Sequence, residues 1–366
     1  MIDTIKLQLD AEIENSFLSD RDANEPFTSG KVPGFTCRIV TTTPSSPYYK
    51  QGRRYMATLD DYEKGISLQG PINYDRGVWE CRTCCIHLRQ LLGLPPGWLL
   101  AEQADLDAAF AAMHNALSWL PPGSLERAIV KEIHLTMNFN LTSVMSAEAI
   151  IASHALVRNT RVRKDSGKWD PGHSSLYWRG TNLVIAMYEK TQQAVAKLAK
   201  DKGVPSSEIR KRYNLNEMLR LEFRVKKSLL TKLFDKVTQP APVNGLPPLP
   251  TNPSLVRLAA INEKTVTALF RELVGEFGNP PLQTIERLST RKFLAMLIRE
   301  EANLKDGTPV IEFAARYMNP KQITLAKGDA RKIDTGSPRF NWHDILGPEG
   351  FGPYAVPQPE QYRDLA

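Results

Sequence analysis

The sequence predicts an α+β fold in which an antiparallel sheet with helices packed on it is followed by a small helical domain. Over residues 1–238, segments that alternate apolar and polar residues, the pattern of half-buried strands, are interspersed with segments of helical periodicity. A proline-rich stretch follows at residues 239–253, and only helical patterns continue beyond it. The 366 residues are long enough to form two such domains.

Alternation is most regular at residues 218–226, where apolar and charged residues succeed one another along a predicted strand. Residues 174–189 are predicted to form a hairpin that turns at residues 179–182. Ser146 is expected to begin a helix. The predicted strands are residues 2–10, 35–42, 77–83, 129–139, 174–178, 182–189 and 218–226, and the predicted helices are residues 103–118, 146–159, 190–201 and 227–236.

Six prolines in residues 239–253 exclude a helix or a central strand there, so this segment is predicted to be an extended linker. Residues 254–340 are predicted to form a helical accessory domain, in which Asn262 caps a helix over residues 263–277. Two further helices are expected, one beginning at Thr284 or Ser289 and one over residues 312–318. The tail comprises residues 341–366, and from Gly347 onward it has repeated proline and glycine and is expected to be loosely ordered.

Composition narrows the class of protein. A hydrophobic content of 42% and a charged content of 24% are typical of soluble globular proteins. No apolar run approaches the roughly 20 residues needed to span a bilayer. The first ten residues carry charges where a signal peptide needs an apolar core. We therefore expect a cytoplasmic protein without a membrane partner.

Three of the four cysteines, Cys81, Cys84 and Cys85, crowd together with His87, and Cys37 stands apart. A zinc site of four ligands usually takes two separated pairs, and no second pair is evident in the sequence. Small buried residues of a reduced protein are therefore the preferred interpretation.

The positive charge is concentrated in one part of the chain. Residues 151–240 contain 19 Lys and Arg against 8 Asp and Glu, a net charge of +11, while the whole chain carries +7. A local excess of basic residues is typical of a nucleic-acid-binding surface, although an ordinary solvated basic surface has the same composition.

Three short segments carry residues that suit DNA strand cleavage. Residues i and i+2 of a strand share a face, so Glu132 and His134 are predicted to point the same way, and so are Tyr188 and Lys190. A carboxylate and an imidazole together can hold Mg²⁺ or Mn²⁺. A tyrosine can attack phosphorus and form a covalent phosphotyrosine, with lysine as a cation for the phosphate.

Each of these residues also has a purely structural interpretation. His134 and Glu222 can be ordinary residues of half-buried strands, and Lys190 can be a solvated residue at the start of a helix. Tyr177 and Tyr213 are rival nucleophiles, and spacing alone does not choose among the three tyrosines.

At this point the chain resembles the replication initiators of filamentous bacteriophages, the gene II type, within the HUH endonuclease superfamily. The resemblance extends over about residues 1–236 and depends on the order and separation of short motifs. It differs from the superfamily motif of two histidines around one apolar residue, because Glu132 takes the first position. The motifs are the opening residues 1–5, Glu132-Ile133-His134-Leu135-Thr136, the segment 183–190 that ends in Tyr188-Glu189-Lys190, and the strand 219–226 that contains Arg220, Glu222 and Arg224.

The resemblance implies a site- and strand-specific DNA nickase and ligase that initiates rolling-circle replication. Tyr188 would become linked to the 5′ phosphate with Lys190 beside it, and the free 3′ hydroxyl would prime synthesis. His134, Glu132 and Glu222 would bind Mg²⁺ or Mn²⁺. The implied partners are phage origin DNA, single-stranded or locally melted, and the host helicase and polymerase; the oligomeric state stays open.

Basic residues are expected to hold the DNA phosphates; the candidates are Arg161, Arg163, Lys164, Arg179 and Arg224. Other functions stay open: a plasmid initiator or relaxase with the same chemistry, a non-catalytic DNA-binding protein that has kept the fold, and a metal-dependent hydrolase unrelated to DNA. Of these, the hydrolase gives no role to the basic segment.

Overall fold

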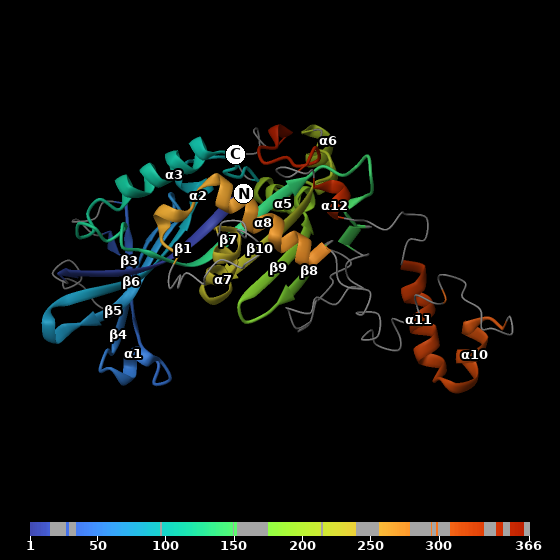
Figure 1. The fold of residues 1–366 in the computed structure, drawn as a ribbon, viewed down its shortest axis with the longest axis horizontal. Coiled ribbons are helices and arrows are strands. Elements are labelled where there is room, and N and C mark those ends of the chain that lie inside the picture. Colours follow the sequence, from blue (N-terminus) through green and yellow to red (C-terminus); the bar gives the residue numbers. More distant parts are fainter. Residues whose placement is uncertain are drawn as a thin grey trace, which may run out of the picture. The chain divides into compact units, whose positions relative to one another are not determined.

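The computed structural model contains a large sheet together with helices, so the predicted α+β class is confirmed (Figure 1). Among the residues that the structure describes, no helix is both long enough and apolar enough to cross a membrane. The residues that the structure describes are 1–14, 27–28, 34–95, 97–148, 150–151, 175–213, 215–238, 256–278, 294, 298, 308–332, 342–346 and 352–361.

Ten strands form one sheet in the order β2-β3-β4-β5-β6-β1-β7-β10-β9-β8. Every pairing for which the structure gives a register is antiparallel, as the sequence predicted. The strands are β1 (Ile2–Glu14), β2 (Phe27–Thr28), β3 (Thr36–Thr41), β4 (Tyr55–Asp61), β5 (Ile66–Asn73), β6 (Val78–His87), β7 (Ile129–Phe139), β8 (Ser175–Arg179), β9 (Leu183–Glu189) and β10 (Leu219–Lys226).

The helices agree with the sequence where capping or periodicity is strong. Asn262 caps α8 as predicted, because its Oδ1 accepts a hydrogen bond of 3.0 Å from the backbone N–H of Thr265. The helices are α1 (Pro47–Lys50), α2 (Leu88–Leu91), α3 (Gln103–Ala116), α5 (Lys190–Lys202), α6 (Ser206–Arg212), α7 (Lys227–Thr238), α8 (Glu263–Gly278), α10 (Val310–Tyr317), α11 (Pro320–Lys332) and α12 (Trp342–Ile345), with short 3₁₀ turns η2 (Tyr74–Arg76) and η3 (Leu258–Ala260).

Two compact units divide the chain, and both are discontinuous in sequence. The first comprises Met1–Thr136, Phe223–Phe270 and Pro357–Ala366, and the second comprises Met137–Glu222 and Arg271–Val356. Because the first unit includes residues on both sides of residues 239–253, the predicted domain boundary does not coincide with the division between these units. The predicted linker itself lies outside the described residues.

The β4–β5 hairpin was not predicted, because Gly70 and Pro71 interrupt the pattern of β5. Both residues have a structural reason. A Cβ atom at Gly70 would lie 1.8 Å from the carbonyl oxygen of Glu80, so only glycine permits this close approach of β6. The register between β5 and β6 shifts between Gln69 and Ile72, which is the kind of irregularity where a strand tolerates proline.

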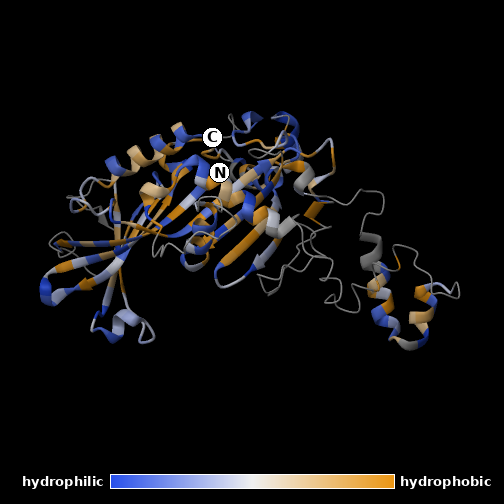
Figure 2. Ribbon diagram, in the orientation of Figure 1, coloured by the Kyte–Doolittle hydropathy of each residue, from blue (hydrophilic) through white to orange (hydrophobic). Residues whose placement is uncertain are grey.

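Apolar side chains on the strands build the core of the first unit, and Figure 2 shows hydrophobic residues along the strands. In β1 the residues Ile5, Leu7 and Leu9 are buried and alternate with half-buried or exposed polar residues. Phe223 of β10 packs edge-to-face on Phe270 of α8 at 5.4 Å between ring centroids. Because successive residues of a strand point to opposite faces, Glu222 and Arg224 lie on the face of β10 opposite to Phe223.

Beyond residue 278 the structure describes one of the two predicted helices and part of the tail. The helix predicted over 312–318 corresponds to α10, which contributes Ala314 to a small apolar cluster with Ile323 and Ala326 of α11. Of the predicted helix ending near residue 303, only residues 294 and 298 are described. The expectation of a loose tail is wrong for residues 352–361, since Val356 donates a backbone hydrogen bond of 2.8 Å to Asn138.

Candidate active site

Glu132 and His134 lie on one face of β7, as the sequence predicted. His134 Nε2 and Glu132 Oε1 are 2.8 Å apart. His134 is buried, at 9% exposure, and Glu132 is half-buried. The direct contact between an imidazole and a carboxylate fixes the orientation of both side chains.

Lys6 of β1 completes this group, and the sequence analysis did not identify it. Its Nζ donates a hydrogen bond of 2.9 Å to the same Glu132 oxygen that contacts His134. In the sheet Lys6 stands opposite Glu132 of β7 and opposite Cys85 of β6. The alternation of Lys6 with buried Ile5 and Leu7 was visible in the sequence, but its cross-strand partners were not.

His87 of β6 was also missed. Thr4 pairs with His87 on one side and with His134 on the other, and Thr4 Oγ1 lies 2.9 Å from His87 Nδ1. Polar side chains therefore form a row on one face of the sheet, across the adjacent strands β6, β1 and β7 of the first unit.

Charge and burial shift the ionisation of this group. Burial raises the pKa of the Glu132 carboxyl, but hydrogen bonds from His134 and Lys6 outweigh it, and the pKa is lowered overall. Burial lowers the pKa of His87, and Asp3 opposes that shift. Glu132 is therefore held ionised, which suits a group that binds cations.

The fit of this group to a divalent metal is partial. A carboxylate and an imidazole are donors that Mn²⁺ and Mg²⁺ sites use. A metal ion held by both side chains would have to replace the direct contact between His134 Nε2 and Glu132 Oε1, the oxygen that also accepts from Lys6. Within the ranges that the structure covers, no group of three or more His, Cys, Asp or Glu side chains has the geometry to hold a metal ion.

Tyr188, near the end of β9, contacts Glu222 of β10 in the second unit. Its phenol hydroxyl donates a hydrogen bond of 3.3 Å to Glu222 Oε2. Both residues are buried, at 8% and 6% exposure. A carboxylate at this position can accept the proton that a phenol loses when it attacks an electrophile.

Lys190 does not share a strand face with Tyr188, so that prediction is wrong. The strand ends at Glu189, whose carboxylate accepts a hydrogen bond from the backbone N–H of Gln192 and caps α5. Lys190 is the first residue of this helix, and its Nζ donates to Gln193 Oε1 at 2.9 Å.

Glu189, between Tyr188 and Lys190, is an unusual carboxylate. It is 4% exposed, and its Oε2 also accepts a hydrogen bond of 2.8 Å from Arg210. Burial raises its pKa and outweighs the opposing effect of Arg210.

The rival tyrosines are held differently. Tyr213 accepts a hydrogen bond of 2.8 Å from Lys202 at an exposed position, with Arg212 near its ring. Tyr177 is a half-buried residue of β8 and pairs with Ala186. The hydroxyl of Tyr188 donates to a carboxylate, whereas that of Tyr213 accepts from an ammonium.

Of the predicted phosphate-binding residues, Arg179 is exposed at the end of β8 and Arg224 is partly exposed in β10. Arg161, Arg163 and Lys164 lie outside the described residues. The neighbouring Arg220 is buried and donates to Asn138 Oδ1 at 2.7 Å, so it stabilises the sheet interior.

All four cysteines are free thiols. The prediction of small buried residues is confirmed for Cys37, Cys81 and Cys84, whereas Cys85 is half-buried. Burial raises the pKa of Cys37 to about 11 and that of Cys81 to about 12. Protonated thiols are poor nucleophiles and poor metal ligands.

No protein-family model, curated protein or solved structure matches this chain. The resemblance to phage replication initiators therefore depends on the motifs in the sequence.

Proposed function

We propose that the chain is a site- and strand-specific DNA endonuclease with strand-joining activity, which starts rolling-circle replication of a filamentous-phage DNA. The observation that carries the proposal is the hydrogen bond from the Tyr188 hydroxyl to the buried carboxylate of Glu222. A nucleophile with an adjacent base is the arrangement that covalent catalysis needs.

In the proposed reaction the Tyr188 oxygen attacks a DNA phosphorus while Glu222 accepts the phenol proton. The bond from phosphorus to the 3′ oxygen of the preceding nucleotide breaks, and that oxygen takes a proton from water. The products are a 5′-phosphotyrosyl ester and a free 3′ hydroxyl. Because a phosphodiester bond is exchanged for another of similar energy, the hydroxyl can later attack the ester and rejoin the strand.

The remaining predicted residues keep supporting roles in the proposal. Glu132 and His134 of the first unit are candidate ligands for Mg²⁺ or Mn²⁺, which when bound would offset charge on the phosphate oxygens. Glu222 of the second unit stays a separate candidate ligand. Lys190, Arg179 and Arg224 are candidate phosphate contacts from side chains that are at least partly exposed.

The test of the proposal is formation of a covalent protein–DNA adduct. The protein is incubated with Mg²⁺ or Mn²⁺ and labelled single-stranded oligonucleotides that tile the origin of its replicon, and SDS-resistant adducts are measured. We expect an adduct that Tyr188→Phe abolishes. Glu222→Gln should slow adduct formation by about 10²- to 10⁴-fold, the usual contribution of a general base.

Two matched variants control for the loss of any tyrosine. Tyr213→Phe and Tyr177→Phe should both form the adduct at the wild-type rate. An adduct that survives Tyr188→Phe would keep the class of enzyme and refute the assigned nucleophile. Tight DNA binding with no adduct under either metal would instead favour the non-catalytic DNA-binding alternative, in which the buried Tyr188–Glu222 bond only stabilises the fold.

A further inference from the structure

A second region of the first unit combines aromatic and basic side chains. The connection from β3 to β4 contains α1, and between Thr41 and Met56 it has three tyrosines, three cations and no Asp or Glu. Tyr74 of η2 lies beside it, because its ring packs edge-to-face on Tyr55 at 5.5 Å. We call this group the tyrosine–cation platform, and its members are Tyr48, Tyr49, Lys50, Arg54, Tyr55 and Tyr74.

Two of the four rings of the tyrosine–cation platform are exposed to solvent, and those of Tyr48 and Tyr49 are half-buried. Tyr55 is 37% exposed and Tyr74 is 59% exposed, and Val40 beside them is 45% exposed. The guanidinium of Arg54 lies 3.9 Å from the centroid of the Tyr49 ring. Exposed aromatic rings gathered with cations mark an interaction surface more often than scattered single residues do.

Hydrogen bonds hold this connection in one conformation. Thr42 donates its backbone N–H to the carbonyl of Arg54 at 2.8 Å and its hydroxyl to the carbonyl of Arg53 at 2.7 Å. Tyr48 accepts from the backbone N–H of Arg53 at 2.9 Å. Gly52 permits the reversal of the chain because its φ is +80°. The rings are therefore presented by a preorganised loop, which lowers the entropic cost of binding.

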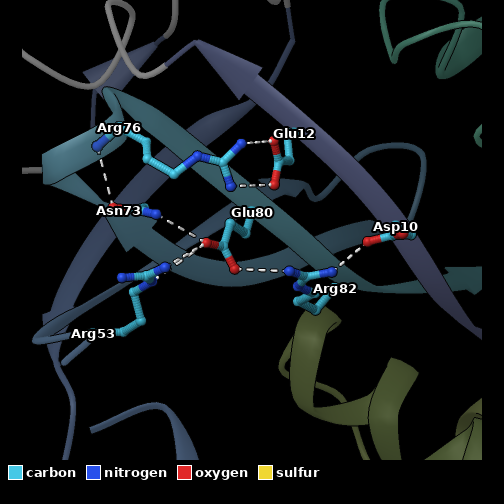
Figure 3. Close-up of polar contacts among 7 residues, drawn as sticks. All are labelled: Asp10, Glu12, Arg53, Asn73, Arg76, Glu80 and Arg82. Atoms are coloured by element: carbon cyan, nitrogen blue, oxygen red, sulfur yellow. Dashed lines mark hydrogen bonds and ion pairs between the residues drawn. The ribbon is translucent and has the colours of Figure 1, made fainter. Parts of the chain in front are cut away.

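Some cations at this end of the sheet form ion pairs with carboxylates, and others do not. Figure 3 shows Arg53 bonded to Glu80 and Arg76 bonded to Glu12, so both charges are compensated. Lys50 and Arg54 are exposed, and neither forms an ion pair within the described part of the chain. Lys50 and Arg54 therefore offer uncompensated positive charge to a partner, and Asp75 beside Tyr74 is the one exposed carboxylate within η2.

The platform is distant from the candidate metal ligands. In the first unit β5, β6 and β1 stand between β4 and β7. The register leads from Tyr55 through Ile72 and Trp79 to Ile13, which lies seven residues along β1 from Lys6. At about 3.3 Å per residue this separation is about 23 Å along the strand alone.

We infer that the tyrosine–cation platform binds single-stranded DNA. Bases that are free of a complementary strand can stack on the exposed tyrosine rings, and Lys50 and Arg54 can contact the phosphates between them. A duplex would offer its phosphates but not the faces of its bases. This site does not depend on Tyr188 being a nucleophile, since stacking and phosphate contacts require no covalent step.

The experiment measures binding of fluorescent dT20 by anisotropy, with oligonucleotides that contain no origin sequence. We expect Tyr49→Ala and Tyr74→Ala each to weaken binding at least about fivefold, the lower range for loss of one stacked base. Tyr62→Ala is the matched control, because Tyr62 is 69% exposed at the opposite end of the β4–β5 hairpin. It should bind dT20 as the wild type does.

Salt dependence tests the role of the cations. Lys50→Gln combined with Arg54→Gln should reduce the slope of log Kd against log salt by about 1.4, which corresponds to two lost contacts with single-stranded phosphates. Lys64→Gln, at the opposite end of the hairpin, should leave the slope unchanged. Circular dichroism confirms that each variant is folded.

Three results would overturn the inference. The first is that Tyr49→Ala and Tyr74→Ala both bind dT20 as tightly as the wild type does, and the second is that Tyr62→Ala weakens dT20 binding as much as they do. The third is that duplex DNA of the same length competes for the protein as well as unlabelled dT20 does. Because dT20 binding is measured without any covalent step, failure of the adduct test and failure of this test are separate outcomes.

Discussion

Two buried carboxylates, Glu80 in β6 and Glu189 at the end of β9, receive very different numbers of hydrogen bonds. Both are almost inaccessible, at 6% and 4% exposure. Around Glu80, donors reach both oxygens; they come from Arg53, Asn73 and Arg82 (Figure 3). Glu189 accepts hydrogen bonds at Oε2 alone, and its buried Oε1 accepts none from the residues that the structure describes.

The pKa values of the two carboxyl groups move in opposite directions as a result. Burial raises the pKa of Glu80, but hydrogen bonds from Arg82, Asn73 and Arg53 outweigh it and lower the pKa. Burial raises the pKa of Glu189 and prevails over Arg210. The same chemical group therefore stabilises the sheet in one unit and is electrostatically unfavourable in the other, beside the candidate nucleophile. Perturbed groups of the second kind are common at functional sites.

The largest expected effect is the loss of the Glu80 charge. Glu80→Gln leaves Arg53 and Arg82, which are 23% and 34% exposed, without their shared anion. The cost therefore lies between about 1 kcal/mol for an exposed pair and about 3 kcal/mol for a buried one. We expect a loss of this size in the free energy of unfolding, measured in urea at neutral pH. Hydrogen exchange should show the increased opening in β5 and β6.

The matched control is Glu12→Gln in the same network. Glu12 pairs with Arg76, but their side chains are 39% and 56% exposed. An exposed pair contributes less than about 1 kcal/mol. If Glu12→Gln and Glu80→Gln destabilise the protein equally, burial does not distinguish the two carboxylates and the comparison fails.

Acid should weaken the same network. Because the pKa of Glu80 is lowered in the folded protein, its contribution to stability is present above the ordinary glutamate pKa, about 4.3, and is lost as the pH falls through the folded value. One proton limits this dependence to about 1.4 kcal/mol per pH unit. Unfolding free energies measured from pH 6 to pH 3 should fall less steeply in Glu80→Gln than in wild type. Equal slopes would show that Glu80 does not titrate differently in the folded and unfolded chains.

Local patterns in the sequence were sufficient where the determinant is itself local. The alternation at Leu219–Lys226 predicts β10, and Glu189 with its following helical pattern marks the change from β9 to α5. The face shared by Glu132 and His134 follows from the period of a strand. These features depend on residues that are neighbours in the sequence, so a single sequence is sufficient to predict them.

Contacts between distant residues could not be predicted in the same way. Lys6 and Glu132 are 126 residues apart, and their meeting depends on β1 pairing with β7. Tyr188 and Glu222 were both candidates, but their hydrogen bond requires the side chains of two strands to converge. The β4–β5 hairpin was hidden because Gly70 is needed for a close approach to β6, and in the sequence it resembles a strand breaker.

The smallest expected effect is the loss of the Glu189 charge. Glu189→Gln keeps an oxygen that can cap α5 and removes a buried charge that is incompletely compensated. We therefore expect a change of less than about 1 kcal/mol in the free energy of unfolding at neutral pH. Hydrogen exchange measures where the change occurs: the substitution should alter protection in α5 and leave protection in β5 and β6 unchanged.

The pH dependence of this variant has the opposite sign to that of Glu80→Gln. Because the folded pKa of Glu189 is raised, its contribution to stability is fully present below the ordinary value of about 4.3 and is lost as the pH rises through the folded pKa. Wild type should therefore lose stability relative to Glu189→Gln between pH 4 and pH 7. If the variant instead loses stability relative to wild type over this range, Glu189 is as well compensated as Glu80, and the two buried carboxylates are equivalent.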